Sequence, residues 1–464
     1  MTWQAIEEYL STQAARFEAE LHELLRIPSV SAEPDRREEL RRAADWIAVR
    51  LGRMGLRVET ISTEGAPIVY AESPSVPSAP TALVYGHYDV QPVDPLDQWV
   101  TPPFEPAVRE GRIYARGATD DKGQLLTHVN GAEAWLAVEG KLPVRLKFLI
   151  EGEEEIGSAS LERLLRDEAE RLACDVAVIS DSAQFAPDQP AITYGLRGIA
   201  CYELQLRGPR RDLHSGSFGG AVTSPALALA RMLAGLVDQQ GRIQIPGFYD
   251  DVVELSDRER EELRRLPFDE QRFYAEIGVE TGWGEAGYTP LERRWTRPSY
   301  DICGLGSGYQ GEGFKTVLPA TAGAKLSFRL VPRQDPEKIS RQLRRRLEEL
   351  CPPGVTFELS DSHGSPAMLV SLESPWIAAA ARAIEVAFGR RPVFTREGGS
   401  IPIVAAMHQV LGADVLLLGW GQDDDNTHSP NERFSLRDYH RGALASARLW
   451  AELAALGTAR SSAP

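Results

Sequence analysis

The sequence predicts an α/β protein with a mostly parallel sheet, interrupted by an inserted α+β unit. Three observations support this fold class. Helical and buried-strand patterns alternate through residues 1–198, as in a parallel sheet with crossover helices. Residues 199–373 instead contain strands that alternate apolar and polar residues, as in a half-exposed antiparallel sheet. The α/β pattern returns over residues 374–464.

The first segment, residues 1–198, alternates helices with short apolar strands. Apolar residues at helical spacing predict the helices, and apolar runs of strand length predict the strands. The expected helices are 3–26, 35–54, 123–138 and 158–173. The expected strands are 56–63, 67–73, 81–90, 144–152 and 174–181. This order favours a sheet in which several neighbouring strands run in the same direction.

The middle and last segments complete the arrangement. Strands are expected at 197–208 and 322–332, with a helix at 224–239 between them, and the polar stretch 250–297 is given no chemistry. The last segment is expected to contain helices at 375–388, 401–411 and 436–456 and a strand at 413–420. The sequence therefore favours one α/β domain that encloses an insert over two domains in series.

Composition restricts the classes of function. The 464 residues are 43% hydrophobic and 25% charged, as in ordinary soluble proteins, and the net charge is −16. This charge argues against nucleic acid and anionic membranes as partners. No apolar run is long enough to span a membrane, and the N-terminus predicts an amphipathic helix instead of a signal peptide. The four cysteines are far apart, which favours reduced thiols and a cytoplasmic location.

Acidic residues and two histidines stand at or just beyond the ends of the predicted strands and at a helix start. They are His87 and Asp89, Asp120 and Asp121, Glu151 and Glu153–Glu155, Asp181, and His428 after Asp423–Asp425. Each position alone also fits a structural role, because an acid at a helix start is often a cap and a charged loop is often solvated. Solvation is the role expected of Asp423, Asp424 and Asp425.

As a set, these residues favour a pair of metal ions. Divalent metals bind histidine nitrogens and carboxylate oxygens, and ligands of open α/β sheets bind at the carboxyl ends of strands. Two cations would also neutralise the crowded glutamates of residues 151–155. Two metals that share one bridging carboxylate can polarise a carbonyl and activate a water molecule.

Ordered motifs along nearly the whole chain resemble the co-catalytic di-zinc exopeptidases. This family includes carboxypeptidase G, acetylornithine deacetylase, succinyl-diaminopimelate desuccinylase and the carnosine and cytosolic non-specific dipeptidases. The resemblance is closest to the dipeptidase branch. The motifs are YGHYDVQP, GRIYARGATDDKG, EGEEEIGS, ITYGLRGI, DLHSGSFGG, KTVLPA, SFRLVP, TREGGSIP and HSPNE.

The resemblance implies a set of metal ligands. His87 and Asp181 match the ligands of one metal, Glu155 and His428 match those of the other, and Asp120 matches the bridging carboxylate. Zinc is the expected metal of both sites, with manganese or cobalt as alternatives. The family also implies a cis peptide bond between Asp120 and Asp121.

The resemblance also implies catalytic roles. Asp89 would orient His87, and Glu154 would act as the general base that deprotonates the metal-bridging water and then protonates the departing amine. Glu151 and Glu153 are expected to be supporting or surface acids. His214 would stabilise the oxyanion from the partner subunit of a homodimer.

A third set matches family positions near the substrate: Thr316, Arg329, His363, Glu397, Gly399 and Ser400. Arg329 suits a substrate carboxylate because a guanidinium binds it through two hydrogen bonds, although a structural ion pair is the alternative. Glu397 suits a free α-amino group. The insert would serve as a lid and dimerisation domain. His22, His128, His408 and His440 fall in helical stretches and are expected to be structural or surface residues.

The expected function is metal-dependent hydrolysis of dipeptides. The alternative within the same fold is an N-acyl-amino-acid deacylase or a carboxypeptidase. A non-catalytic relative that acts as a binding protein is disfavoured, because every ligand position and Glu154 hold chemically competent residues.

Overall fold

The computed structural model describes residues 2–461, which form two compact units. Unit 1 covers the chain up to Tyr194, Val370–Thr395 and the residues from Ala406 onward; unit 2 covers Gly195–Leu369 and Arg396–Ala405. The segment Gly195–Leu369 of unit 2 overlaps the predicted insert, residues 199–373. Unit 2 also takes in Arg396–Ala405, because Arg197 Nε donates a hydrogen bond to Gly398 O (3.0 Å) and Arg329 Nη1 donates one to Ser400 Oγ (3.1 Å).

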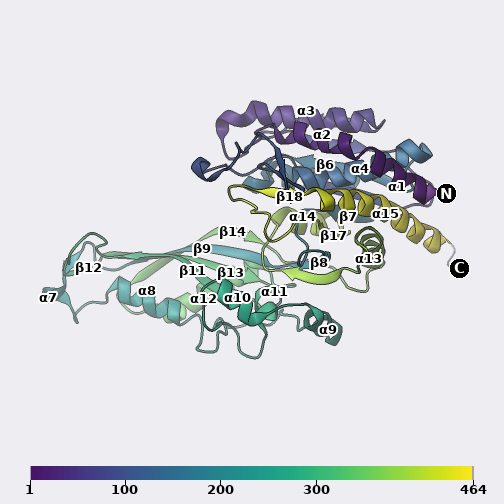
Figure 1. The fold of residues 1–464 in the computed structure, drawn as a ribbon. Coiled ribbons are helices and arrows are strands. Elements are labelled where there is room, and N and C mark those ends of the chain that lie inside the picture. The colour runs from purple at the N-terminus through teal and green to yellow at the C-terminus, as the bar shows by residue number, and fades with distance from the viewer. Residues whose placement is uncertain (1, 462–464) are drawn as a thin grey trace. The chain divides into compact units, whose positions relative to one another are not determined.

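Unit 1 is built on a mixed sheet (Figure 1). Its strands follow the order β1 (Arg57–Ile61), β2 (Ile68–Glu72), β6 (Arg145–Glu151), β3 (Thr81–His87), β7 (Val176–Ile179), β17 (Asp414–Gly419), β8 (Ala191–Leu196) and β15 (Met368–Leu369), and β16 (Val393–Glu397) also pairs with β8. The central strands β6, β3, β7 and β17 are parallel, whereas the pairs β1–β2, β2–β6 and β17–β8 are antiparallel. The predicted α/β class is confirmed, with parallel pairing confined to the centre of the sheet.

Helices enclose this sheet. They are α1 (Thr2–Thr12), α2 (Ala14–Leu25), α3 (Arg37–Arg53), α4 (Lys122–Glu139), α5 (Ala159–Asp167), α6 (Ala169–Leu172), α13 (Pro375–Phe388) and α15 (Leu436–Ser461). The helix expected at 3–26 is interrupted at Gln13, and the helix expected at 158–173 is interrupted at Glu168. Helix α4 packs against β3, α1 and α15, so it is buried through most of its length. Helix α14 (Pro402–Leu411) spans the boundary between the two units.

A small sheet in unit 1 joins two segments that lie far apart in the sequence. Strand β18 (Arg433–Ser435) pairs with β5 (Arg112–Tyr114), which pairs with β4 (Ala107–Arg109). Because β5 precedes Asp120 and β18 follows His428, this pairing brings the two loops that contain these residues close to each other.

Unit 2 contains a four-stranded antiparallel sheet in the order β11 (Ser299–Ser307), β13 (Thr321–Leu330), β9 (Gly198–Arg207) and β14 (Thr356–Ser365). Helices α8 (Pro225–Ala234) and α12 (Pro336–Leu350) cover one face of it. The side chains of Ile339, Leu343 and Leu347 recur every four residues on α12 and are buried in the core of this unit. Phe328 of β13 stacks on Tyr300 of β11 with ring centroids 5.0 Å apart.

Shorter elements complete unit 2. They are β10 (Leu213–His214), α7 (Ser215–Phe218), α9 (Asp257–Arg265), α10 (Glu270–Glu276), α11 (Pro290–Trp295) and β12 (Val317–Leu318). The polar stretch 250–297 therefore contains three of these helices. Two of them begin with a capping box, formed by Ser256 with Glu259 and by Thr289 with Glu292. Within residues 2–461, no helix combines the length and the apolar composition that a membrane crossing needs.

Candidate metal centre

The candidate metal ligands lie at one edge of the unit 1 sheet. His87 is the last residue of β3, and Asp181 follows β7, the parallel neighbour of β3. Glu155 lies in a short 3-10 helix after β6, the other parallel neighbour of β3. Asp120 lies just before α4, and His428 lies in the loop between β17 and β18. The carboxyl ends of neighbouring parallel strands meet at one edge, so residues far apart in the sequence gather there.

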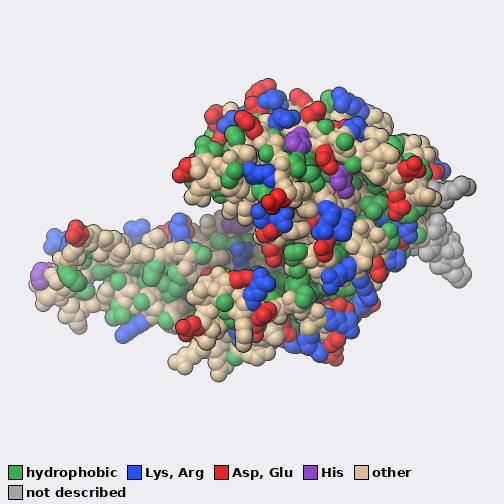
Figure 2. All heavy atoms as spheres, in the orientation of Figure 1, with side chains coloured by type: hydrophobic (Ala, Val, Ile, Leu, Met, Phe, Trp, Pro, Cys, Tyr) green, Lys and Arg blue, Asp and Glu red, His purple; other side chains and the backbone are tan. Residues whose placement is uncertain are grey.

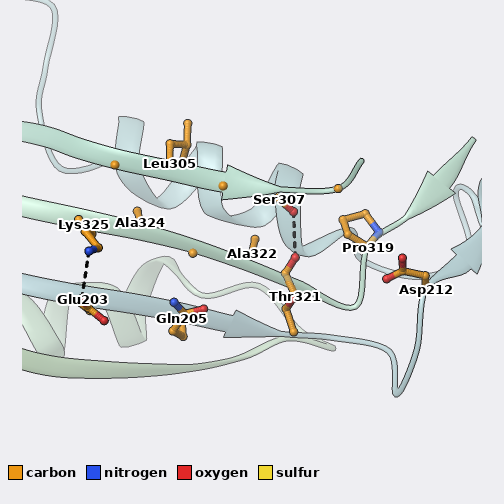
Figure 3. Close-up of a pocket in the computed structure, with 14 residues that line it drawn as sticks. Glu203, Gln205, Asp212, Leu305, Ser307, Pro319, Thr321, Ala322, Ala324 and Lys325 are labelled. Atoms are coloured by element: carbon orange, nitrogen blue, oxygen red, sulfur yellow. Dashed lines mark hydrogen bonds and ion pairs between the residues drawn. The ribbon is translucent and has the colours of Figure 1, made fainter. Parts of the chain in front are cut away.

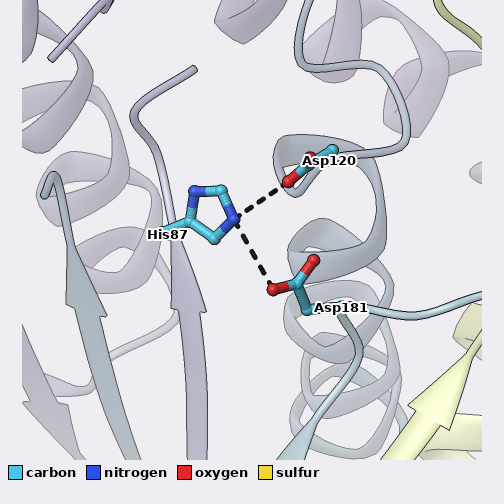
Figure 4. Close-up of side chains that lie close together, drawn as sticks. All are labelled: His87, Asp120 and Asp181. Atoms are coloured by element: carbon cyan, nitrogen blue, oxygen red, sulfur yellow. Dashed lines mark ion pairs between the residues drawn. The ribbon is translucent and has the colours of Figure 1, made fainter. Parts of the chain in front are cut away.

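Asp120 belongs to two groups of possible ligands, one with His87 and Asp181 and the other with Glu155 and His428. Its Oδ1 lies 3.1 Å from His87 Nε2, and its Oδ2 lies 2.9 Å from His428 Nε2. His87 Nε2 also lies 3.8 Å from Asp181 Oδ2 (Figure 4). His428 Nε2 lies 3.2 Å from Glu155 Oε2. Each group therefore combines one imidazole with two carboxylates, and Asp120 turns one oxygen toward each.

His87 provides a test of whether a metal suits this site. Its Nε2 atom is buried and has no hydrogen-bond partner within residues 2–461, although two carboxylate oxygens lie nearby. On the other side of the ring, Nδ1 lies 3.1 Å from the main-chain oxygen of Asp89 and 3.3 Å from Asp89 Oδ1. A ring held at Nδ1 with a buried, unbonded Nε2 is the arrangement of a metal-binding histidine. The residues present fit a divalent cation.

The electrostatics of the cluster point the same way. Burial raises the pKa of Asp181 to about 7, and the negative charge of Asp120 adds to this rise. Hydrogen bonds to Asp120 and Glu155 raise the pKa of His428 to about 10. Burial opposes the charged forms of Asp120 and His87, but the opposite charges of the neighbouring imidazoles and carboxylates outweigh it. They hold the pKa of Asp120 below its ordinary value and that of His87 well above. Negative charge exceeds positive charge here, and divalent cations would reverse that balance.

Asp89 and Glu154 stand beside the ligands. Asp89 is completely buried, and its two carboxylate oxygens accept hydrogen bonds from the main-chain N–H groups of Glu154 (3.3 Å) and Glu155 (3.1 Å). One carboxylate therefore contacts the His87 ring and also holds the turn that contains the two glutamates. Burial raises the pKa of Glu154 to about 8. Among residues 2–461, no hydrogen-bond donor reaches the Glu154 carboxylate, which leaves it available to a proton.

The two other glutamates of the EGEEEIGS motif are buried and support the turn. Glu151 accepts hydrogen bonds from the hydroxyls of Tyr85 (2.9 Å) and Ser158 (2.7 Å). Glu153 accepts hydrogen bonds from the main-chain N–H groups of Ala66 (2.8 Å) and Ser160 (3.0 Å). Neither is a surface acid, because the side chains are 1% and 7% exposed in turn.

The prediction that Asp425 is solvated is wrong. Asp425 is buried and accepts a hydrogen bond from Thr119 Oγ1 (3.1 Å), which joins the His428 loop to the segment before Asp120, and one from Gln422 N (2.8 Å) within that loop. Asp424 is exposed but forms ion pairs with Arg112 (2.9 Å) and Arg433 (2.8 Å). Asp423 is exposed.

The peptide bond between Asp120 and Asp121 is cis, as the resemblance implies.

Three of the four helical histidines have structural partners, in agreement with the expectation. His128 is buried between the hydroxyls of Ser180 and Ser446. His440 forms an ion pair with Glu18 at 2.7 Å, and the Nδ1 atom of His408 lies 2.8 Å from the main-chain oxygen of Ala413. None of these three contacts a candidate ligand.

The remaining predicted site residues lie in unit 2, in two places. His214 and Thr316 are close together, because β10 pairs with β12 and Ser215 N donates to Thr316 O (3.1 Å). Arg329 donates a hydrogen bond to Ser400. Arg329 pairs with Ile199 of β9, and His363 of β14 pairs with Cys201, two residues further along β9 and on the same face of the sheet. Ser400 in turn donates to the main-chain oxygen of Arg197. Glu397 ends β16, and Gly399 follows in the same exposed turn.

Sequence reasoning does not single out Glu432 and Arg116, two buried residues next to the metal ligands. Glu432 is completely buried and accepts a hydrogen bond from Arg116 Nη1 at 2.8 Å. The available signal is the HSPNE motif, whose last letter is Glu432. Its partners are main-chain amides far away in the sequence, which no local pattern indicates.

A buried imidazole whose Nε2 has no hydrogen bond within residues 2–461, surrounded by a surplus of carboxylates at the edge of an α/β sheet, is typical of metal-dependent hydrolases. This is the class of protein that the fold and the site define.

Comparisons with known proteins identify the family. Residues 83–452 match the model of Peptidase family M20/M25/M40. The Beta-Ala-His dipeptidase of Homo sapiens is 35% identical over 475 residues, which cover 97% of this chain and 92% of that protein. The Cys-Gly metallodipeptidase DUG1 of Saccharomyces cerevisiae is 34% identical over 453 residues, which cover 92% and 93%.

A solved structure agrees. The M20 family metallo-carboxypeptidase Sso-CP2 from Sulfolobus solfataricus is 33% identical with a TM-score of 0.82, over 95% of this chain and 99% of that one. The chain therefore belongs to Peptidase family M20/M25/M40. The resemblance inferred from the motifs is confirmed, and the protein is a peptide-bond hydrolase.

Proposed function

We propose that this protein is a metallo-dipeptidase that uses two divalent cations per chain. The observation that carries the proposal is the position of Asp120, whose two oxygens face the imidazoles of His87 and His428. Relatives that match nearly the whole chain are named dipeptidases, which favours dipeptides as substrates. Zinc is the preferred candidate metal, with manganese or cobalt as alternatives, because all three bind this set of nitrogen and oxygen donors.

The proposed roles divide between the metals and the protein. Bound divalent cations would polarise the scissile carbonyl and acidify water. Glu154 accepts the proton of the attacking water and returns it to the departing amine. Asp89 keeps Glu154 in place through the hydrogen bond from Glu154 N, and it orients His87 through the contact with Nδ1. His87 and Asp181 would hold one cation, Glu155 and His428 would hold the other, and Asp120 would contribute to both sites.

Residues of unit 2 are proposed to bind the ends of the substrate. Arg329 binds the C-terminal carboxylate, since Ser400 is a neutral partner and no acidic side chain within residues 2–461 lies at ion-pair distance from Arg329. The main-chain N–H of Gly399 adds a donor for the same group, and Ser400 holds the Arg329 guanidinium in place by accepting its hydrogen bond. Glu397 is proposed to bind the free α-amino group.

Two further side chains are proposed to line the substrate site. They are Thr316, beside His214, and His363, on the same sheet face as Arg329. A hydroxyl and an imidazole at these positions can both donate hydrogen bonds to main-chain oxygens of a peptide.

We also propose a homodimer in which His214 acts across the interface. His214 is exposed, and only its Nδ1 atom is engaged within unit 2, by Gly216 N at 3.0 Å. Strand β11 lies at the edge of its sheet with Ile302 44% and Leu305 66% exposed. An apolar edge strand of this kind is a natural pairing surface.

Two further features of unit 2 support the proposal that two subunits pair through this unit. A hollow of about 530 Å³ on β9, β11 and β13 includes several small residues, among them Gly304, Gly306 and Gly323, which permit close approach (Figure 3). Hydrophobic side chains also gather around α7 and α8 (Figure 2), where Phe218, Val222 and Leu227 are exposed.

The four cysteines are free, which supports a cytoplasmic location.

The second candidate function is that of a carboxypeptidase or an N-acyl-amino-acid deacylase. The similarity to a metallo-carboxypeptidase structure favours it specifically. The test compares an unblocked dipeptide with its N-acetylated form, using protein loaded with zinc or with manganese. The dipeptidase proposal predicts faster hydrolysis of the unblocked peptide. Hydrolysis of only the blocked peptide would instead establish the second function and remove the role given to Glu397.

A further inference from the structure

Glu432 is a completely buried carboxylate that is close to the metal ligands without being one of them. Its Oε1 accepts hydrogen bonds from the main-chain N–H groups of Thr119 (3.0 Å) and Asp120 (3.3 Å). Its Oε2 accepts them from Gly117 N (2.9 Å) and from Arg116 Nη1 (2.8 Å). One side chain therefore satisfies four donors, three of which belong to the main chain that leads to Asp120.

Arg116 extends this contact to a third segment. Its Nη2 donates to the main-chain oxygen of Pro92 (3.0 Å), in the segment that follows His87. The guanidinium is 1% exposed and lies over the Trp99 ring. In addition, Ala115 N donates to Glu432 O (3.1 Å). The buried pair of Arg116 and Glu432 therefore joins the segments that carry His87, Asp120 and His428.

We propose that Glu432 is a positioning residue that fixes the main chain at Asp120, so that each carboxylate oxygen of Asp120 faces a different cation. This inference rests on the proposed metal dependence. Since Asp120 is common to both groups of ligands, a displaced Asp120 weakens the binding of both cations. Loss of Glu155 or Asp181, which belong to one group each, weakens mainly one.

A carboxylate is the side chain that this position requires. Both oxygens of Glu432 accept hydrogen bonds, so glutamine would place an NH₂ group against N–H donors on one side. Partners that orient metal ligands typically contribute 10- to 100-fold to metal affinity. We therefore expect Glu432→Gln to lower the affinity for both cations by about 10- to 100-fold.

The test measures metal binding directly. Metal-free protein is titrated with zinc, and separately with manganese, in competition with a chromophoric chelator. Asp424→Asn is the matched control, because it makes the same change in the same loop at an exposed carboxylate that pairs with Arg112 and Arg433. Asp424→Asn should bind both ions like the unchanged protein. Unchanged affinity in folded Glu432→Gln, or loss of only one ion, would overturn the proposal.

A second variant guards against misfolding, because Glu432→Gln leaves the charge of Arg116 buried without a partner. The double variant Arg116→Met/Glu432→Gln removes both charges and should fold, as judged by circular dichroism and thermal unfolding. It should show the same weakening for both ions, and peptide hydrolysis should recover at high metal concentration with little change in KM. If the double variant folds and binds both metal ions as tightly as the unchanged protein, the inference is also contradicted. If the unchanged protein binds no divalent ion, the proposed function itself fails.

Discussion

Asp120 Oδ2 lies 2.9 Å from Nε2 of His428, although Asp120 lies just before helix α4 and His428 follows strand β17. The other oxygen of Asp120 faces a different imidazole. A carboxylate divided in this way between two histidines is suited to bridge two cations, and this arrangement leads to distinct expectations for each ligand.

Metal content should depend on which ligand is changed. Asp120→Ala should abolish tight binding of both ions, because Asp120 contributes to both groups. Glu155→Gln and Asp181→Asn should each lose mainly one ion. Elemental analysis after gel filtration measures the number of ions per chain. Loss of a single ion from Asp120→Ala would show that the carboxylate does not bridge.

Glu154→Gln should lower kcat by about 10²- to 10⁴-fold, the usual contribution of a general base. Metal content should remain that of the unchanged protein, since Glu154 belongs to neither ligand group. Steady-state kinetics and elemental analysis on the same preparation separate the two effects. Substantial remaining turnover would place the base elsewhere.

The homodimer proposal predicts complementation between two inactive variants. His214→Ala chains mixed with Glu154→Gln chains should recover activity, because a heterodimer contains one site with an intact base and an intact partner histidine. Chain exchange is verified by native mass spectrometry. If exchange is complete and activity stays absent, His214 acts within its own chain.

Arg329→Lys should lower kcat/KM for dipeptides by about 10- to 100-fold, the effect of losing charge-assisted hydrogen bonds of about 1.5–3 kcal/mol. For a dipeptide with an amidated C-terminus, the ratio between the two proteins should approach one. Arg341→Lys, at an exposed arginine of α12 in the same unit, serves as the control. An equal loss with both substrates would contradict carboxylate binding by Arg329.

His128 should make stability depend on pH. Burial lowers its pKa to about 3, whereas an unfolded histidine has a pKa of about 6.5. Between these values only the unfolded chain binds the proton. The free energy of unfolding therefore falls as pH drops below about 6.5, by up to about 1.4 kcal/mol per unit. Urea unfolding of metal-free protein should show a smaller pH slope for His128→Asn. If the free energy of unfolding depends on pH equally in both proteins, the unfolding of the protein does not cause His128 to bind a proton.

The sequence predicted the α/β class, which is confirmed, because alternating helices and apolar strands are local patterns. The inserted lid domain and the assignment of metal ligands stay predictions, and the second of these also drew on the family resemblance. An apolar strand that is followed at its end by His87 or Asp181 can be recognised in the sequence without any knowledge of distant contacts. The motifs also separate Glu154 and Glu155 from Glu151 and Glu153, whose burial follows from contacts with distant residues such as Tyr85 and Ala66.

Contacts between segments far apart in the sequence could not be predicted in the same way. The burial of Asp425 depends on Thr119, and the role of Glu432 depends on amides of residues 117–120. The sequence also does not show that Arg396–Ala405 joins the inserted unit, since the hydrogen bonds from Arg197 and Arg329 that hold it cross long stretches of chain.

The central claim is that Asp120 and its neighbours form a two-metal peptidase site. The most direct measurement is the number of divalent ions bound per chain, determined together with hydrolysis of an unblocked dipeptide as metal is added to metal-free protein. We predict that two ions bind tightly and that activity rises with their occupancy. Less than one tightly bound ion per chain, with no hydrolysis after zinc, manganese or cobalt is added, would contradict the account.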